Sequence, residues 1–329
     1  MALRKIDQDT MKLDIGVPLV SIVCTAYNHR DYIENTLEGF VMQQTSFPFE
    51  VIVHDDASTD DTVNVIKKYE QKYPHLFHNI YQVENQYSRG VDIWRYLFQF
   101  CCRGKYIAIC EGDDYWIDPM KLQKQVDFLE EHQNYGMVYG CVYYYQQNIG
   151  KFINTFGKNI EVIQDLLRGN VIPTLTVCMR RSLYLEYVKE IKPLQQNWKM
   201  ADYPMWLWFS YKSSVKFMED VLGVYRILPE SMSHSANFQK ELDFVESYAS
   251  IKRFFLNRFG IEDPYIIRNI EEQYLIGVYR IVIRHHMSSD VIKERIKEIT
   301  SRTFKIYVIC FAIRIPVIRR LLRWYWGIS

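Results

Sequence analysis

Residues 50–62 read EVIVHDDASTDDT, and this stretch decides the fold class. Val51 to Val53 is a short, branched, apolar run of the kind that forms a buried strand. The run ends in the acid pair Asp55-Asp56, and Ser58 with Asp61 then fits the first turn of a helix. A buried strand that passes through a polar turn into a helix is the repeating unit of an α/β fold.

The same pattern occurs before and after this stretch. Leu19 to Ala26 is a buried-strand run followed by Tyr27-Asn28, and Tyr106 to Cys110 is another that leads into Glu111-Gly112-Asp113-Asp114. Apolar residues at helical spacing separate these runs. We therefore predict a mostly parallel central sheet with helices on both faces. Ligands of such sheets bind at the carboxyl ends of the strands, where all three polar clusters fall.

Length and composition fit one large domain with a smaller appendage. The chain has 329 residues, of which 48% are hydrophobic and 15% aromatic, and this is enough for a full core. From about Phe238 onward, helical patterns replace strands. We predict an N-terminal extension over residues 1–17, an α/β domain over 18–237, a helical extension over 238–300 and a basic, aromatic tail over 301–329.

Charge and cysteine content exclude several classes of protein. The formal net charge is +1, so no nucleic-acid partner is expected. Seven cysteines without a CxxC pair predict reduced core thiols and no thiolate zinc site. The N-terminus lacks the apolar run of a signal peptide, and no stretch reaches the roughly 18 uninterrupted apolar residues of a membrane span. We therefore expect a cytoplasmic location.

The tail over residues 301–329 contains basic and aromatic side chains in alternation and no acidic residue. This combination predicts a helix that lies on an anionic membrane surface, here the inner face of the cytoplasmic membrane. The alternative is a terminal helix docked on the domain.

The acid pair Asp113-Asp114 follows directly after a predicted buried strand. Adjacent carboxylates at a strand end suit a hard cation such as Mg²⁺ or Mn²⁺, which keeps several waters and takes its other oxygens from a substrate diphosphate. Such an ion would neutralise charge that develops on a departing nucleoside diphosphate. The alternative is a solvated acidic turn.

Other polar residues are candidates for substrate contacts. A carboxylate of Asp55-Asp56 could accept the N3–H of a uracil or thymine ring, or these acids could only favour the positive N-terminus of the next helix. Arg89, in a polar loop, and Arg226, after an apolar segment, could each bind a diphosphate bidentately. The ordinary expectation for each arginine is a surface position.

Asp202 precedes a strongly apolar segment, and Pro204 predicts that a helix starts there. A carboxylate at this point could take the proton from an acceptor hydroxyl as general base, a role worth roughly 10²- to 10⁴-fold in rate. The alternative is a helix-capping aspartate. Trp116, Trp206 and Trp208 could stack on sugar rings, although core packing is the ordinary expectation for two of the three.

Three segments together resemble family 2 glycosyltransferases of the GT-A fold, in particular bacterial enzymes of capsule and surface-polysaccharide assembly. They are residues 20–28 (VSIVCTAYN), 50–62 (EVIVHDDASTDDT) and 104–116 (GKYIAICEGDDYW). Each segment alone is a weak signal, but their order and spacing are specific. The resemblance covers Pro18 to about His234, two thirds of the chain.

The resemblance implies a sugar donor linked to UDP or dTDP, Mn²⁺ or Mg²⁺ as the cofactor, and a saccharide or lipid-linked saccharide as the acceptor. It also implies inversion at the anomeric carbon by a single in-line displacement, which needs one base and no enzyme nucleophile. The residues that it assigns are Thr25, Tyr27 and Asp56 at the nucleoside, Asp114 at the metal with Asp113 beside it at the donor sugar, and Asp202 as the base.

The chain departs from the family pattern in two places. Many relatives carry a histidine two residues after the arginine of a Tyr-Arg pair, whereas Tyr225-Arg226 is followed here by Ile227-Leu228. We take His234 as the candidate substitute for this third metal ligand. The Gln-x-x-Arg-Trp motif of processive synthases is also missing, because Arg320 stands where the glutamine would precede Arg323-Trp324. We therefore expect one sugar to be added per encounter.

Two other functions fit part of the pattern. A nucleotidyltransferase also combines a strand-rich nucleotide fold with Mg²⁺, but it would carry a glycine-rich phosphate loop after the first strand. Residues 25–31 contain no glycine. A catalytically inactive binding protein would keep the GT-A fold, and the intact Asp56, Asp114 and Asp202 argue against it.

Overall fold

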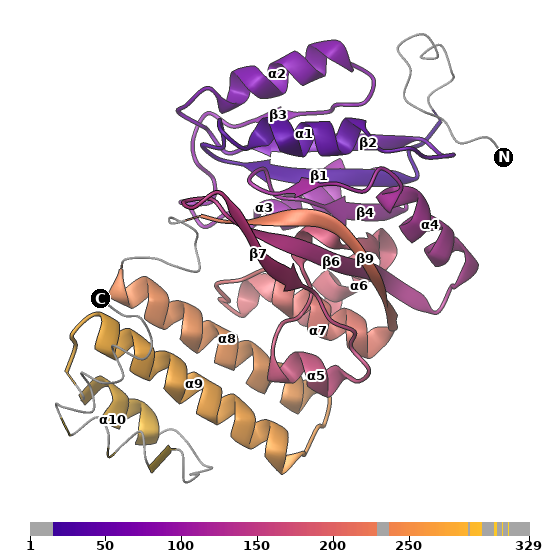
Figure 1. The fold of residues 1–329 in the computed structure, drawn as a ribbon. Helices are drawn as coiled ribbons and strands as arrows, with labels where there is room; N and C mark the ends of the chain where they lie inside the picture. The colour runs from indigo at the N-terminus through magenta and orange to yellow at the C-terminus, as the bar shows by residue number, and fades with distance from the viewer. Residues whose placement is uncertain are drawn as a thin grey trace. The chain divides into compact units, whose positions relative to one another are not determined.

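The computed structural model describes residues 16–228, 237–288 and 290–297, together with residues 306, 307, 311 and 315 (Figure 1). The chain divides into two compact units, which we name the sheet unit and the helical unit. The sheet unit comprises Met1–Glu161, Val171–Gln195 and Trp208–Leu228. The helical unit comprises Val162–Asn170, Gln196–Leu207 and Pro229–Ser329. Two short segments upstream of residue 237 therefore group with the helices that follow it.

The sheet unit is built on a nine-stranded sheet with the strand order β3-β2-β1-β4-β8-β6-β9-β5, in which β7 pairs with β6. The predicted α/β class is confirmed. Strands β1 to β4 pair in parallel, and so do β6 and β9, whereas β5, β7 and β8 pair with their neighbours in antiparallel fashion. The strands are β1 (Val20–Ala26), β2 (Phe49–Asp55), β3 (Ile80–Tyr81), β4 (Tyr106–Ile109), β5 (Tyr115–Trp116), β6 (Tyr135–Gln146), β7 (Lys151–Phe156), β8 (Cys178–Arg180) and β9 (Ser214–Ile227).

Helices cover this sheet because their apolar residues recur at helical spacing. In α1, Ile33, Leu37 and Phe40 are fully buried at intervals of four and three residues. The Phe40 ring packs edge-on against Trp116 with the centroids 4.9 Å apart, and the Trp116 indole N–H donates to the carbonyl oxygen of Leu175 at 2.6 Å. The helices of the sheet unit are α1 (Ile33–Val41), α2 (Thr62–Lys72), α3 (Ile93–Tyr96) with a π-helical turn at Leu97–Cys101, α4 (Lys121–Glu131) and α6 (Arg181–Ile191).

The core of the sheet unit is apolar and contains reduced thiols. Every residue of β1 except Thr25 is buried, as expected for a strand covered on both faces. Six cysteines within the described ranges are free. Burial raises the pKa of Cys24 and Cys110 well above its ordinary value, so both thiols stay protonated. This agrees with the predicted reduced core thiols.

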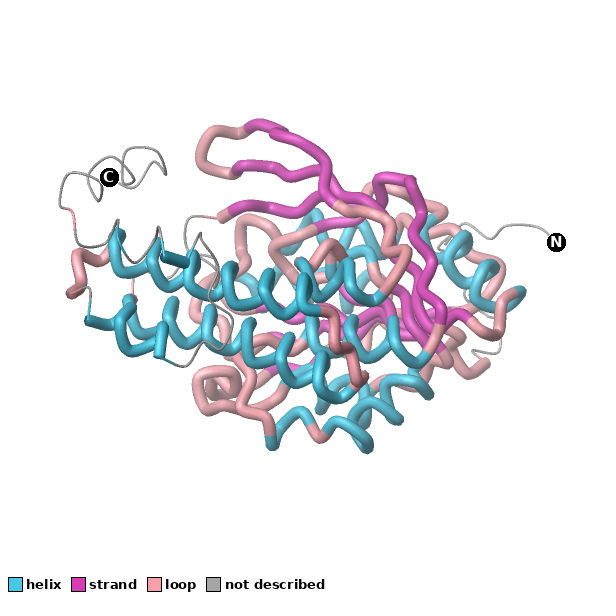
Figure 2. The backbone as a smooth tube through the Cα atoms, turned by 90° about the horizontal axis from the view of Figure 1, so that it is seen from below, coloured by secondary structure: helices cyan, strands magenta, loops and turns pink. Residues whose placement is uncertain are grey.

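The helical unit contains α5 (Ile163–Arg168), α8 (Phe238–Arg258), α9 (Pro264–Arg284) and α10 (Asp290–Lys297). The long helices α8 and α9 run side by side (Figure 2). Residue Asn237 caps α8 by accepting the Lys240 N–H, and Asp263 caps α9 ahead of a proline at the first helical position. The prediction that helices replace strands after Phe238 is thus confirmed. The bounds of α7 (Asp202–Lys212) overlap both units.

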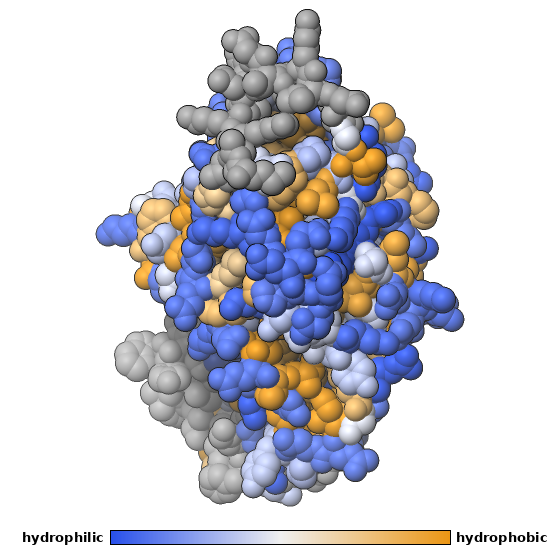
Figure 3. All heavy atoms as spheres, turned by 90° about the vertical axis from the view of Figure 1, so that its right-hand side faces the viewer, coloured by the Kyte–Doolittle hydropathy of each residue, from blue (hydrophilic) through white to orange (hydrophobic). Residues whose placement is uncertain are grey.

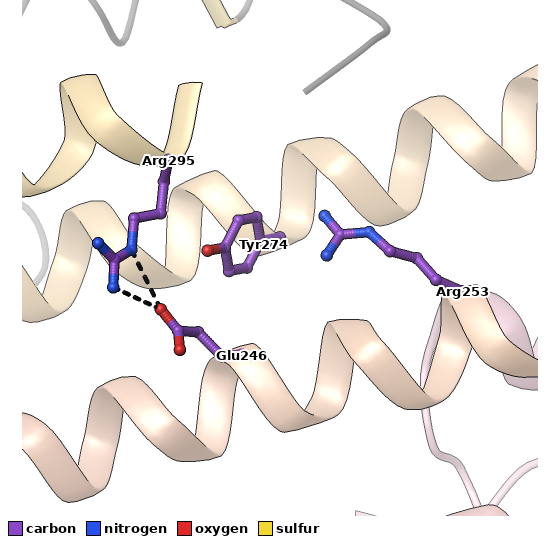
Figure 4. A pocket seen from close by; sticks show the side chains of 4 residues that line it. All are labelled: Glu246, Arg253, Tyr274 and Arg295. Carbon is purple, nitrogen blue, oxygen red and sulfur yellow. Dashed lines mark hydrogen bonds and ion pairs between the residues drawn. The ribbon is translucent and has the colours of Figure 1, made fainter. Parts of the chain in front are cut away.

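A pocket of about 260 Å³ in the helical unit is lined by Glu246, Arg253, Tyr274 and Arg295 (Figure 4). Its charged groups are already paired. Arg295 donates two hydrogen bonds, of 2.8 and 3.1 Å, to one oxygen of Glu246, and Arg253 forms a bidentate pair with Glu271. These pairs tie α8, α9 and α10 together, so we assign the pocket lining a structural role.

The surface visible in Figure 3 is mostly hydrophilic, with apolar side chains in small groups. Within the ranges that the structure describes, we find no helix with the length and apolar character needed to cross a membrane. The predicted membrane-surface helix over residues 301–329 lies outside the described residues, apart from four positions, and stays a prediction.

Candidate functional site

The polar segments that follow β1, β2 and β4 meet at one edge of the sheet. Strand register places Ala26 beside Asp55, and the Asp56 N–H donates to the carbonyl oxygen of Ala26 at 2.9 Å. On the other side of β1, the Gly112 N–H donates to the carbonyl oxygen of Thr25 at 2.9 Å. The convergence expected from the sequence is therefore present within the sheet unit, and it brings Thr25, Asp56 and the turn of residues 111–114 together.

The loops after β1 and β2 hold each other in place. Asn28 adopts a left-handed conformation with φ of 55°, which asparagine tolerates better than most residues. Its N–H donates to Ser58 Oγ at 2.9 Å, and its Oδ1 accepts the Thr59 N–H at 2.8 Å. This pair of loops leaves Tyr27 45% exposed and Thr25 half-buried. The Tyr27 ring is thus presented to solvent by a fixed backbone.

Asp56 organises the loop that carries Arg89. Its carboxylate is buried and accepts the backbone N–H groups of Gln86 at 2.7 Å and Tyr87 at 3.0 Å. Each carboxylate oxygen has a second lone pair, so Asp56 retains capacity for a ligand N–H. Arg89 is exposed and forms an ion pair with Glu84 of the same loop. The structure therefore places Asp56 and Arg89 in one hydrogen-bonded assembly.

The acidic turn of residues 111–114 is fixed from two sides. The Asp114 carboxyl is buried, and its Oδ1 accepts the backbone N–H of Arg226 at 2.8 Å. The Thr36 hydroxyl on α1 lies 3.0 Å from the carbonyl oxygen of Gly112 and 2.6 Å from that of Asp114, so its one hydrogen is shared between them. Asp113 is half-buried and is the more accessible acid of the pair.

Arg226 is a structural residue of this turn. Its Nη1 donates to the carbonyl oxygen of Asp113 at 2.5 Å, and its Nη2 donates to Asn35 Oδ1 at 2.6 Å. The guanidinium also lies over the Tyr115 and Tyr32 rings, 4.5 and 5.3 Å from their centroids. The ordinary expectation of a surface arginine is wrong here, because Arg226 is only 6% exposed. Its donors are bound by the protein.

Crowded carboxylates dominate the electrostatics of this edge. Burial raises the pKa of Asp114 well above its ordinary value, and the charges of Asp113 and Glu111 raise it further. The hydrogen bond from the Arg226 backbone N–H and the positive charge of Arg226 both lower the pKa of Asp114. The acidic turn is therefore a place where positive charge is favourable.

His29 is a residue of this site that sequence reasoning missed. Its Nδ1 is buried and has no hydrogen-bond partner among the described residues. It lies so close to Gly112 that a Cβ there would approach Nδ1 to 2.8 Å. Burial lowers the pKa of His29, while nearby Asp113 and Asp60 raise it. The only signal in the sequence is its position directly after Tyr27-Asn28.

The remaining predicted residues have different outcomes. Asp202 is the first residue of α7 and belongs to the helical unit, so its predicted role as base stays a prediction. His234 lies outside the described residues.

Trp116, Trp206 and Trp208 are at most 1% exposed. Their predicted stacking on sugar rings is wrong in this structure, because core packing buries all three indoles.

Comparison with known proteins identifies the family. A family model described as Glycosyl transferase family 2 matches residues 21–184. The putative teichuronic acid biosynthesis glycosyltransferase TuaG of Bacillus subtilis is 31% identical over 219 residues, which cover 66% of this chain and 82% of TuaG. WfaP of Escherichia coli, a UDP-Glc:alpha-D-GlcNAc-diphosphoundecaprenol beta-1,3-glucosyltransferase by name, is 37% identical over 112 residues, 34% of this chain and 41% of WfaP.

Two further comparisons concern length and fold. The match to uncharacterised mycobacterial proteins, at 34% identity, spans only 61% of their length. The structure of TarS (1-349) from S. aureus in complex with UDP aligns with a TM-score of 0.50 over 89% of both chains, at 17% identity. This likeness confirms the predicted GT-A fold. From the family match, the similarity to TuaG and the shared fold, we conclude that the chain belongs to glycosyl transferase family 2.

Proposed function

We propose that the chain is an inverting, metal-dependent glycosyltransferase that moves one sugar from a nucleotide-sugar donor to a hydroxyl of a saccharide or lipid-linked acceptor. The observation that carries the proposal is the acidic turn of residues 111–114, held beside the loops of β1 and β2 at one sheet edge. Family membership supports the reaction class and disfavours the nucleotidyltransferase alternative.

The loops after β1 and β2 supply the proposed nucleoside site. Tyr27 presents an accessible ring that can pack on a base, and Thr25 lies two residues before it in the sequence. Asp56 would use its remaining lone pairs to accept the N3–H of uracil or thymine. The name of WfaP, which specifies UDP-Glc, supports a UDP-linked donor, and dTDP offers the same N3–H.

The acidic turn is the proposed site of Mn²⁺ or Mg²⁺. Glu111, Asp113 and Asp114 place three carboxylates in four residues, and their oxygens are the ligands that hard divalent cations prefer. Asp114 is buried and bound to the Arg226 N–H, whereas Asp113 is half-buried. We therefore propose that Asp113 provides the more accessible metal ligand and Asp114 the buried one. When bound, the ion would supply positive charge to the departing diphosphate.

Within the ranges that the structure describes, no three His, Cys, Asp or Glu side chains are arranged as a metal site. The donor set at the acidic turn is therefore proposed from its oxygen chemistry. His234 stays the predicted additional ligand. Arg89 would contribute charge at the diphosphate by exchanging its exposed partner Glu84 for phosphate oxygens.

Inversion requires a base that faces the anomeric carbon from the side of the acceptor. We propose Asp202 for this role, because it is the first residue of the apolar helix α7 and the family resemblance implies a base at this residue. The base would take the proton of the acceptor hydroxyl as the new glycosidic bond forms. The bond to the diphosphate breaks in the same step, so no covalent enzyme intermediate is formed.

The proposed acceptor is a saccharide of a surface polysaccharide, linked to lipid. The names of TuaG, for teichuronic acid biosynthesis, and of WfaP, for a diphosphoundecaprenol-linked sugar, support this class. A lipid-linked acceptor also fits the proposed contact of residues 301–329 with the inner face of the cytoplasmic membrane. Addition of one sugar per encounter remains the expected mode.

Calorimetric titration of UDP with and without Mn²⁺ tests the proposal. We expect UDP to bind about tenfold or more tightly with Mn²⁺, and Asp113→Asn to remove this difference. Asp220→Asn is a matched control, because Asp220 on β9 is exposed and pairs with Lys124. A panel of UDP- and dTDP-sugars would then be screened for release of the nucleotide. Equal UDP affinity in Mn²⁺ and EDTA would contradict the metal assignment.

A further inference from the structure

The segment that carries Asp202 is attached to helix α8, and all of the contacts lie within the helical unit. The backbone N–H of Lys199 donates to Ser247 Oγ at 2.8 Å. One helical residue further, the Tyr203 and Tyr248 rings pack with their centroids 4.8 Å apart and their planes inclined by 36°. The residue next to Asp202 is therefore in direct contact with α8.

The Tyr203 and Tyr248 hydroxyls also bind the last turn of α5. Tyr203 donates to the carbonyl oxygen of Leu166 at 2.6 Å, and Tyr248 accepts the Asn170 N–H at 3.0 Å. The pair links α5, α7 and α8 at one point.

The same turn of α5 is held by two further side chains. Lys252 on α8 and Gln273 on α9 donate to the carbonyl oxygen of Arg168, at 3.3 and 2.7 Å, and Lys252 also donates to Gln273 Oε1 at 2.6 Å. A cation at a helix C-terminus interacts favourably with the helix dipole. The end of α5, to which Tyr203 and Tyr248 bind, is therefore itself held in place by α8 and α9.

The charge of Asp202 affects the pKa of both tyrosines. Tyr203 is 1% exposed, and burial raises its pKa well above the ordinary value. Burial also raises the pKa of Tyr248, and the negative charge of Asp202 adds to the increase in both cases. Both hydroxyls therefore remain protonated next to the segment that carries the carboxylate.

We propose that Tyr248 is a positioning residue for Asp202. Through Tyr203 it fixes the first turn of α7 to α5 and α8, so that the Asp202 carboxylate is presented in one orientation. The inference rests on the proposed function, in which Asp202 is the general base.

Tyr248→Phe tests the inference, because it removes one hydroxyl and keeps the ring contact with Tyr203. The assay is release of UDP from whichever UDP-sugar the wild-type protein hydrolyses with Mn²⁺, with water as acceptor, since water must lose a proton as an acceptor hydroxyl does. We expect kcat to fall about tenfold, equivalent to roughly 1.4 kcal/mol in the barrier. The affinity for UDP should change by less than about twofold. Tyr265→Phe is the matched control, because Tyr265 is 76% exposed on α9.

An Asp202→Asn background separates positioning from general packing. If Tyr248 acts through Asp202, then Tyr248→Phe should lower kcat in the wild-type background and have no further effect beside Asp202→Asn. A kcat of Tyr248→Phe equal to that of Tyr265→Phe would overturn the inference. So would an equal loss in both backgrounds, because this would indicate a packing effect.

Folding and function are checked separately. If Tyr248→Phe fails to fold, Tyr203→Phe takes its place, since it leaves the bond between Asn170 and Tyr248 intact and should give the same pattern. A fully active Asp202→Asn variant would overturn the inference through its premise, while UDP binding with Mn²⁺ would still support the proposed donor site. Absence of both UDP binding and hydrolysis in the wild type would instead contradict the proposed function itself.

Discussion

The backbone N–H of Arg226 donates a 2.8 Å hydrogen bond to Oδ1 of Asp114, although 112 residues separate the two positions in the chain. The Arg226 side chain binds the neighbouring carbonyl oxygen of Asp113. The end of β9 therefore helps to fix the shape of the turn that follows β4.

Replacing Arg226 by lysine should loosen the acidic turn. Lysine keeps the charge but loses the fork that reaches Asp113 and Asn35 at the same time. We expect a loss of about 2–4 kcal/mol in the free energy of unfolding, because buried acceptors lose their donors. Urea denaturation measures this loss, and UDP calorimetry with Mn²⁺ should show weaker binding. Arg168→Lys, at an exposed arginine of α5, should change stability by less than about 0.5 kcal/mol.

Thr36→Val should have a related but smaller effect. Valine has nearly the same shape, so the variant removes only the hydroxyl that the carbonyl oxygens of Gly112 and Asp114 share. Two buried acceptors lose a donor, and we expect a cost of about 1–3 kcal/mol in thermal or urea unfolding. The control is Thr155→Val, since Thr155 is exposed on β7. Equal stability of the two variants would show that the shared hydroxyl is dispensable.

Gly112→Ala should destabilise the fold through His29. A Cβ at position 112 would lie 2.8 Å from His29 Nδ1 and 2.9 Å from Ile33 Cδ1, which is closer than real Cβ contacts. We expect a loss of about 1–3 kcal/mol. His29→Ala opens space on one side, so a double-mutant cycle should give a favourable coupling of at least about 0.5 kcal/mol. Strict additivity would mean that Ile33, and not His29, limits the size of residue 112.

Asp114 should make the stability of the metal-free protein depend on pH. Its folded-state pKa is raised by burial and by Asp113 and Glu111, whereas an unfolded aspartate titrates near about 3.9. The contribution of Asp114 to stability is therefore fully present below about pH 4 and is lost as pH rises through the raised folded-state pKa. Asp114→Asn keeps an acceptor for the Arg226 N–H and removes the charge.

We expect the metal-free Asp114→Asn variant to be more stable than the wild type at pH 7, with a gap that narrows toward pH 4. Urea unfolding in EDTA at several pH values measures this gap. Saturating Mn²⁺ should stabilise the wild type at pH 7 more than the variant, because the cation offsets the crowded negative charge. A gap that stays constant between pH 4 and 7 would exclude Asp114 as the titrating group.

The fold could be predicted from sequence because its signals are local. The runs 19–26, 51–53 and 106–110 predict buried strands, and the polar residues after them mark the sheet edge that the structure confirms. The three-residue strand β8 has no such periodicity, so the antiparallel part of the sheet was not foreseen.

The supporting residues of the site could not be predicted in the same way. Thr36 acts on residues 76 and 78 positions away, and Arg226 acts on Asn35 across 191 positions. Nothing in the local sequence of either residue shows that its donors are used by the protein. Burial of Arg226 depends on β9 lying beside the acidic turn, which is a property of the tertiary structure alone.

The interleaved course of the helical unit has a consequence for recombination between relatives. A chimera that exchanged only the residues after 237 would take α8 from the relative and keep Asn170 and Tyr203 from this chain. The two residues that contact Tyr248 here would then pack against a different helix sequence. A chimera that exchanges the C-terminal helices should therefore keep these contacts only when Val162–Asn170 and Gln196–Leu207 are exchanged together with them.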